Sequence, residues 1–319
     1  MRAITKFSMT MAVAAVAVLL SSTLASTQQP PPGAPAQGGA PGGGRRGGGG
    51  FSQPDPRDFN EHDGWTSLFD GKTLNGWSGD DNWKVEDGAI VIESSCEKPT
   101  GTVYLVWQGG EAADFELKLE MKGTGNINGG VQYRGWIVPP APPRTGGAPP
   151  AGAAPGGPGG GGGGQGGGGG RGPQGPCPSG AARGTPPSRE SEAKWNMAGA
   201  QYDFDAANQY TGQFYEQATG RGIIAFKGQA VRTETGKNKR LIATLGEPAD
   251  INAIYKPNEW NELHIIAVGK TMTHLLNGRV ISILVDQDAS KFHGTGIIGL
   301  EVESTGKLFT RNIWLKKLS

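Results

Sequence analysis

Residues Phe115–Lys122 read FELKLEMK, and this stretch decides the fold. Apolar and charged residues alternate strictly along it, beginning with Phe115 and ending with Lys122. A period of two places all the apolar side chains on one face of a β-strand, whereas a helix would scatter them around its circumference. The stretch therefore predicts a strand with one buried face and one face in water.

Short β-rich runs separated by turn-forming residue pairs continue through the rest of the chain. Asp87-Gly88 and Asn277-Gly278 each separate two β-rich runs, and such pairs favour tight hairpins with positive φ. About a dozen short runs of this kind are present, and no segment has a convincing helical pattern. The sequence therefore predicts an all-β fold, a two-sheet antiparallel β-sandwich or jelly roll.

Glycine and proline are concentrated in two segments. The chain of 319 residues holds 56 Gly and 23 Pro, but residues 31–50 alone contain 10 Gly, and residues 141–190 contain 20 Gly and 11 Pro. We expect a disordered leader over 26–60 and a disordered insert at about 139–192. The insert interrupts a single β-sandwich domain, 61–319, and must leave it from an edge or rim.

The N-terminus has the pattern of an export signal. Arg2 and Lys6 precede the apolar run Met9–Leu20, which small residues follow at Ser21–Ser26. This pattern predicts a signal peptide over 1–25 and a periplasmic or extracellular protein with no stable membrane span after cleavage. In that compartment Cys96 and Cys177 are either bridged or two unpaired thiols.

Charge argues against nucleic acid as a partner. Without residues 1–50 and 141–190, the chain carries 22 basic and 28 acidic residues. A mildly acidic body lacks the electrostatic attraction that a polyanion needs. Neither cysteine has a second Cys or a His at ligand spacing, so no zinc site is expected.

Six segments in a fixed order resemble one family. They are Trp65–Trp77 (WTSLFDGKTLNGW), Trp83–Gly88 (WKVEDG), Gly125–Gly135 (GNINGGVQYRG), Glu259–Asn261 (EWN), His274–Gly278 (HLLNG) and Phe309–Ile313 (FTRNI). Together they resemble the 3-keto-disaccharide hydrolase family, also known as DUF1080. The resemblance implies a concanavalin-like jelly roll and an exported hydrolase, or a lyase with hydratase activity, that cleaves 3-keto-glycosides or 3-keto-disaccharides.

A ketone at C3 of a sugar acidifies the proton at C2. A base can remove that proton while the substituent at C1 leaves, and water then adds to the enone. Such a site needs a base near C2, an acid near the glycosidic oxygen and a donor for the developing enolate.

Three residues are the catalytic candidates. His274 matches the family's His in the HLLNG motif, and an imidazole on an exposed strand face suits proton transfer. Glu216 and Asp203 are the candidate acid or base groups. The alternatives are a sheet histidine bonded to a neighbour, a hairpin carboxylate paired with Arg221, and a solvated strand face. His264, in the run LHIIAV, is expected to serve core or cross-strand packing.

Six further residues are substrate-binding candidates: Arg134, Trp136, Gln201, Asp205, Tyr215 and Arg221. Alternation in QYDFD places Gln201, Asp203 and Asp205 on one face of a strand. The same rule places Arg134 beside Gln132, where a guanidinium can hold a sugar hydroxyl or an enolate oxygen, although a rim salt bridge is equally consistent. Trp136 is the candidate platform for stacking a sugar ring.

The sequence is consistent with two functions. The first is an exported enzyme acting on an oxidised sugar or glycoside, and the second is a non-catalytic carbohydrate-binding or cell-surface module on the same fold. No cofactor is expected. Carboxylates on a strand leave a divalent cation such as calcium possible, although no loop with dense oxygen ligands is evident. Oligomeric state is not determined by the sequence.

Overall fold

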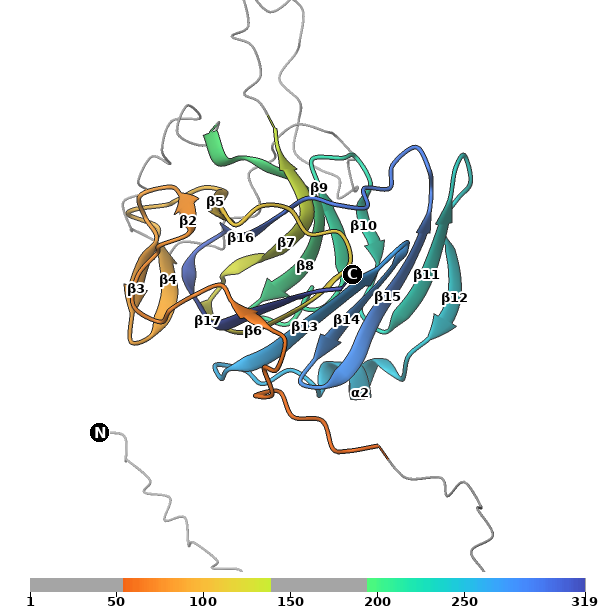
Figure 1. The fold of residues 1–319 in the computed structure, drawn as a ribbon, viewed down its shortest axis with the longest axis horizontal. Helices are drawn as coiled ribbons and strands as arrows, with labels where there is room; N and C mark the ends of the chain where they lie inside the picture. Colours follow the sequence, from red (N-terminus) through yellow and green to blue (C-terminus); the bar gives the residue numbers. More distant parts are fainter. Residues whose placement is uncertain (1–53, 139–193, 319) are drawn as a thin grey trace, which may run out of the picture. The chain divides into compact units, whose positions relative to one another are not determined.

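The computed structural model describes residues 54–138 and 194–318, which form two β-sheets packed face to face (Figure 1). The expected signal peptide, most of the leader, the insert and Cys177 lie outside these residues, so the question of a bridge between Cys96 and Cys177 does too. Within the described part of the chain, no helix is long and apolar enough to cross a membrane.

The first sheet has ten strands in the order β12-β11-β15-β14-β13-β6-β17-β4-β3, with β1 paired to β17. The bounds of these strands are β1 Thr66–Ser67, β3 Lys84–Glu86, β4 Ala89–Ser94, β6 Phe115–Gly125, β11 Gln229–Glu234, β12 Arg240–Thr244, β13 Asn261–Val268, β14 Thr271–Leu276, β15 Arg279–Gln287 and β17 Gly306–Lys317. One short helix, α2 (Pro248–Asn252), connects β12 to β13.

The second sheet has seven strands in the order β10-β9-β8-β7-β16-β5-β2. Their bounds are β2 Trp77–Gly79, β5 Val103–Trp107, β7 Asn128–Ile137, β8 Met197–Asp205, β9 Phe214–Gln217, β10 Gly222–Ala225 and β16 Ile297–Glu303. Because β7 and β8 are neighbours, the two strands that flank residues 139–193 lie side by side. The prediction of an all-β, two-sheet sandwich is therefore confirmed.

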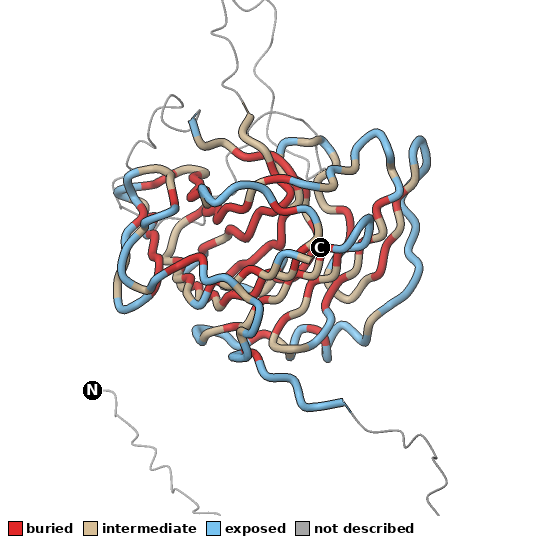
Figure 2. The backbone as a smooth tube through the Cα atoms, viewed as in Figure 1, coloured by how far each residue is buried: buried red, intermediate tan, exposed pale blue. Residues whose placement is uncertain are grey.

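The core lies between the two sheets, where Figure 2 shows the buried backbone. The ten-stranded sheet contributes residues such as Leu117 and Ile265, and the seven-stranded sheet contributes Tyr133, Tyr202 and Phe204, all with no exposed surface. Burial of this apolar surface is the main driving force for packing the sheets.

Strand β6 contains the predicted strand Phe115–Lys122. The four apolar residues of that stretch are fully buried, as its alternation predicts. Lys118 departs from the pattern, because its side chain is only 5% exposed. Its ammonium donates to the carbonyl oxygens of Phe59 (2.9 Å) and Glu61 (2.7 Å), so the chain before β1 covers this part of the outer face.

Both turn pairs form tight hairpins with positive φ. Asp87 (φ 49°) and Gly88 (φ 75°) join β3 to β4, and Asn277 (φ 48°) and Gly278 (φ 78°) join β14 to β15. The antiparallel prediction fails at one place, since β11 pairs with β15 in parallel. These strands are far apart in sequence, so no hairpin turn dictates their relative direction.

Replacing Leu117 by Ala should lower the free energy of unfolding by about 2–5 kcal/mol, because the cavity would form in a fully buried part of the core. Urea denaturation measures this loss. The matched control is Val268→Ala at the end of β13, where the side chain is 47% exposed, and its cost should stay below about 1 kcal/mol. Equal losses in both variants would show that β6 is not a core strand.

Candidate functional site

Strand β8 separates apolar from polar side chains. Tyr202 and Phe204 point into the core, whereas Gln201, Asp203 and Asp205 occupy the opposite, outer face of the seven-stranded sheet. The predicted placement of these three polar residues on one face is confirmed.

Two neighbouring strands bring more polar groups to the same face. Across the sheet, Gln201 pairs with Gln132 of β7, and Asp203 pairs with Gly130, which in turn pairs with Glu301 of β16. No side chain projects from Gly130, so the long Gln201 side chain crosses toward β16. We call this set the carboxyl–amide cluster; its members are Gln132, Gln201, Asp203, Gln213, Glu301 and Glu303.

Hydrogen bonds link the amides to the carboxyl groups. The Gln213 amide donates to Asp203 (Nε2–Oδ2, 2.6 Å). Gln132 donates to Gln201 (3.1 Å), whose own amide nitrogen donates to Oε2 of Glu301 (3.1 Å). These bonds orient each carboxyl group on the sheet.

Burial controls the ionisation of the carboxyl groups. It raises the pKa of Asp203 well above the ordinary value, against the opposing effect of the Gln213 hydrogen bond. It raises the pKa of Glu301 in the same way, and the charges of Glu303 and Asp203 raise it further. The pKa of Glu303 is also raised by burial. Three carboxyl groups with raised pKa values on one sheet face are a pattern that occurs more often at functional sites than elsewhere.

The cluster has unused acceptors and an accessible side. Among the residues described, no hydrogen-bond donor reaches Gln132 Oε1 or Asn128 Oδ1, although both atoms are buried. Tyr215 and Glu303 are partly exposed at the margin, and Asn128 donates to Glu303 (Nδ2–Oε1, 2.7 Å). The two acceptors lie beneath the surface, so Tyr215 and Glu303 form the side of the cluster that a ligand can reach.

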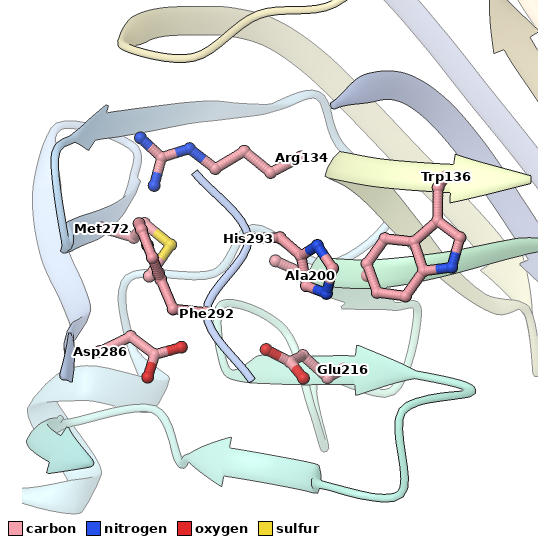
Figure 3. Close-up of a pocket in the computed structure, with 9 residues that line it drawn as sticks. Arg134, Trp136, Ala200, Glu216, Met272, Asp286, Phe292 and His293 are labelled. Atoms are coloured by element: carbon pink, nitrogen blue, oxygen red, sulfur yellow. The ribbon is translucent and has the colours of Figure 1, made fainter. Parts of the chain in front are cut away.

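A separate pocket lies at the rim between the two sheets (Figure 3). Its lining includes Arg134, Trp136, Glu216, Asp286 and His293, with Phe292 on the connection from β15 to β16. The cavity volume is about 10 Å³, which holds about one water molecule. The His293 ring lies 4.1 Å from the Trp136 ring, so it occupies one face of the predicted sugar platform.

Arg134 does not lie beside Gln132. The register of β7 shifts between Tyr133 and Trp136, and Arg134 itself has φ 47°. Its guanidinium donates to the carbonyl oxygens of Ala113 and Gly269 instead. The shared-face prediction is wrong because a β-bulge breaks the alternation, and the observed contacts give Arg134 a structural role.

Glu216 and Arg221 form a network between the sheets. Arg221 Nη1 lies 3.1 Å from Glu216 and 2.8 Å from Asp286 of β15, and Thr219 donates to Glu216 (2.8 Å). Burial raises the pKa of Glu216, and the charge of Arg221 opposes this effect. The arrangement matches the ion-pair alternative for these two residues and places them apart from the carboxyl–amide cluster.

His274 is buried, and its expected exposure is wrong. The ring is stacked on Phe214 (3.6 Å between centroids), and it bonds the Tyr133 hydroxyl (2.8 Å) and the Gly212 carbonyl (3.2 Å). Burial lowers the pKa of His274 to about 3, so the ring is neutral near neutral pH. It belongs to the core and reaches neither the rim pocket nor the carboxyl–amide cluster.

Asp205 stabilises the loop that follows β8 and binds no group of the carboxyl–amide cluster among the hydrogen bonds that the structure describes. Its carboxylate accepts hydrogen bonds from the backbone N–H groups of Gln209 (2.8 Å), Tyr210 (2.7 Å) and Thr211 (3.0 Å).

His264 pairs with Glu116 across neighbouring strands (2.8 Å), as cross-strand packing predicts.

Glu301 and Glu303 were not among the candidates from the sequence. The segment Gly299–Glu303 (GLEVE) has the same alternation as β6, with Leu300 and Val302 in the core. That signal identifies an outer-facing acidic pair. Only the pairing of β16 with β7 shows that the pair lies close to Asp203.

No group of three or more His, Cys, Asp or Glu side chains in residues 54–138 and 194–318 is arranged to hold a metal ion. The carboxyl–amide cluster brings carboxyl groups and amides together on one sheet face, and both kinds of group can form hydrogen bonds with hydroxyls.

The family model of the 3-keto-alpha-glucoside-1,2-lyase-like domain matches residues 64–153 and 179–316. The chain belongs to this family. The resemblance drawn from the six motifs is therefore confirmed, and the domain is a carbohydrate-related one. No curated protein matches the sequence.

Three solved structures are similar to the chain. A candidate glycosyl hydrolase from Parabacteroides distasonis has 14% identity and a TM-score of 0.43, covering 81% of this chain and 95% of its own. The carbohydrate-binding module CBM66 from Bacillus subtilis has 13% identity and a TM-score of 0.39, covering 76% and 95%. A Bacillus subtilis protein of unknown function with a galectin-like fold has 9% identity and a TM-score of 0.43, covering 76% and 90%. Similarity at this level does not establish a shared activity.

His274 should make stability depend on pH. The folded state keeps the ring neutral down to about pH 3, whereas the unfolded chain protonates it below its ordinary pKa of 6.5. Its contribution is therefore full above pH 6.5 and is lost as the pH falls toward 3, at about 1.4 kcal/mol per pH unit. Urea denaturation at pH 4.5, 5.5 and 7.5 measures the slope.

In His274→Phe this part of the pH dependence should disappear, although Tyr133 loses a partner and overall stability falls. The control His293→Gln changes a largely exposed ring at the rim and should keep the slope of the unmodified protein. An unchanged slope in His274→Phe would contradict the buried, neutral assignment.

Proposed function

We propose that the protein cleaves 3-keto-glycosides by elimination at the carboxyl–amide cluster. The observation that carries the proposal is the set of three carboxyl groups with raised pKa values on one sheet face, in a chain of a 3-keto-alpha-glucoside-1,2-lyase-like family. Carboxyl groups of this kind suit proton transfer near neutral pH better than ordinary surface carboxylates do.

Glu303 is the proposed base. It is the partly exposed member of the three, and the amide of Asn128 orients its carboxylate at 2.7 Å. In the ionised form it removes the proton from C2 of the sugar, and the electron pair of the C–H bond forms the enolate of the C3 ketone. A raised pKa makes this carboxylate a stronger base than an ordinary glutamate.

Asp203 is the proposed acid. Burial favours its protonated form, and the Gln213 amide fixes one oxygen at 2.6 Å. As the bond between C1 and the glycosidic oxygen breaks, Asp203 gives its proton to the leaving oxygen, and a double bond forms between C1 and C2. Addition of water to C1 of this enone completes net hydrolysis.

Glu301 and the amides are the proposed positioning groups. Glu301 is buried and bonded to Gln201, so it holds that amide rather than reaching the reacting atoms. Gln132 has no exposed surface and orients Gln201 through its own amide donor. Tyr215 lies opposite Gln201 in the register and closes one side of the proposed site.

Export is part of the same proposal. The N-terminal basic residues and the apolar run Met9–Leu20 support secretion to the periplasm or beyond. The test compares the sizes of the cellular and the exported protein and determines the N-terminal sequence of the exported form. An exported protein that still begins at Met1 would contradict cleavage of a signal peptide.

Activity is tested with 4-nitrophenyl 3-keto-glucoside and the full chain. We expect release of nitrophenol, with kcat lowered about 100-fold or more in Glu303→Gln and in Asp203→Asn, since each loses one proton-transfer group. In D2O, nuclear magnetic resonance should detect deuterium at C2 of recovered substrate if C2 deprotonation is reversible and precedes departure of the leaving group.

The matched control is Glu93→Gln, an exposed glutamate paired only with Lys307, which should keep the activity of the unmodified protein. Cleavage that survives both cluster variants would remove the cluster from catalysis. Failure to cleave any 3-keto-glycoside, with binding retained, would favour the non-catalytic carbohydrate-binding module.

A further inference from the structure

A second hollow is lined by residues of β2 and β5, which form one edge of the seven-stranded sheet. Figure 1 shows these two strands at the opposite side of that sheet from β9 and β10. Its volume is about 390 Å³, within the range of small-molecule sites. We call it the edge cleft. The residues that give it its chemistry are Trp77, Asp80, Asp81, Trp83, Lys194 and Trp195.

Three tryptophans line the edge cleft. Trp77 and Trp83 are 7% and 6% exposed and are fixed in the core, and the Trp77 indole donates to the carbonyl of Leu68 (2.7 Å). Trp195 is partly exposed and packs on the small cluster formed by Tyr104 and its neighbours. Trp77 and Trp83 form a fixed base, and the Trp195 ring is the part that a ligand can contact. Such an aromatic ring suits a flat ligand whose faces carry C–H groups.

Polar groups that can form further hydrogen bonds lie beside these rings. Asp80 accepts only a long hydrogen bond from the backbone N–H of Tyr104 (3.4 Å). The indole N–H of Trp83 is buried and finds no acceptor within the part of the chain that the structure describes. A ligand hydroxyl can donate to Asp80, whereas the Trp83 N–H lies beneath the surface of the cleft. Lys194 lies 4.9 Å over the Trp195 ring and brings an ammonium donor to the entrance.

We propose that the edge cleft binds an unmodified pyranose ring. A pyranose presents C–H groups on its faces for Trp195 and hydroxyl groups at its rim for Asp80 and Asp81. This goes beyond the proposed cleavage, because nothing in the edge cleft requires a ketone at C3. A purely apolar ligand would cover the partly exposed Asp80 carboxyl without offering it a hydrogen-bond donor.

The edge cleft lies next to the carboxyl–amide cluster. Tyr104 of β5 lies between the two, since its backbone bonds Asp80 while its hydroxyl accepts from Gln217 (3.1 Å) on the cluster side of the sheet. In the register, Tyr104 lies directly beside Glu301. Tyr104 is 2% exposed and packs in an apolar cluster with Trp195, so it separates the edge cleft from the carboxyl–amide cluster.

Isothermal titration calorimetry with the full chain tests the inference. The probes are methyl α-D-glucopyranoside, methyl β-D-glucopyranoside and cellobiose, none of which carries a ketone. We expect saturable binding of at least one probe, weakened about 10-fold or more in Trp195→Ala and in Asp80→Asn. Trp260→Ala removes a partly exposed tryptophan that immediately precedes β13 of the ten-stranded sheet, and it should leave the affinity unchanged.

The outcome is independent of cleavage. Asp203→Asn should bind the probes as the unmodified protein does, even where it no longer cleaves a 3-keto-glycoside. Circular dichroism and the melting temperature establish that each variant is folded. No saturable binding of any probe, or equal affinity in folded Trp195→Ala, would overturn the inference whatever the activity of the protein.

Discussion

Strand β8 is packed on both faces, and the candidate site depends on this constraint. On the inner face, Tyr202 lies beside the buried His274 ring and belongs with Phe204 to the hydrophobic core. On the outer face, Gln201 and Asp203 meet polar groups from β7 and β16 and from Gln213, the residue before β9. A shift of β8 by one residue would exchange the two sets and bury the carboxyl group in the core. Core packing thus fixes the position of the polar groups.

The fold could be predicted from local patterns. Alternation in β6, and the positive-φ pairs at Asp87-Gly88 and Asn277-Gly278, are decided by a few neighbouring residues, so the sequence alone indicates strands and hairpins. The shared face of Gln201 and Asp203 follows from the same rule. These features needed no knowledge of which strands lie side by side in space.

The rest of the candidate site depends on long-range pairing. Glu301 reaches Gln201 only because β16 lies next to β7, and no local signal specifies that neighbour. Arg134 leaves the predicted face because of a bulge. His274 is buried because Phe214 and Tyr202 enclose it from the other sheet. Sequence patterns identified strand faces here, but they did not identify the neighbours across each face.

Burial raises the pKa of the Asp203 carboxyl group, which lies within a set of oriented amides, and the proposed role of Asp203 as an acid depends on this shift. The most direct measurement is a pH titration of the Asp203 side-chain carboxyl carbon by 13C nuclear magnetic resonance, assigned by comparison with Asp203→Asn. The midpoint should lie well above the ordinary value of 3.8. A midpoint at or below 3.8 would contradict this role, because Asp203 would then be an ordinary carboxylate with no proton to give.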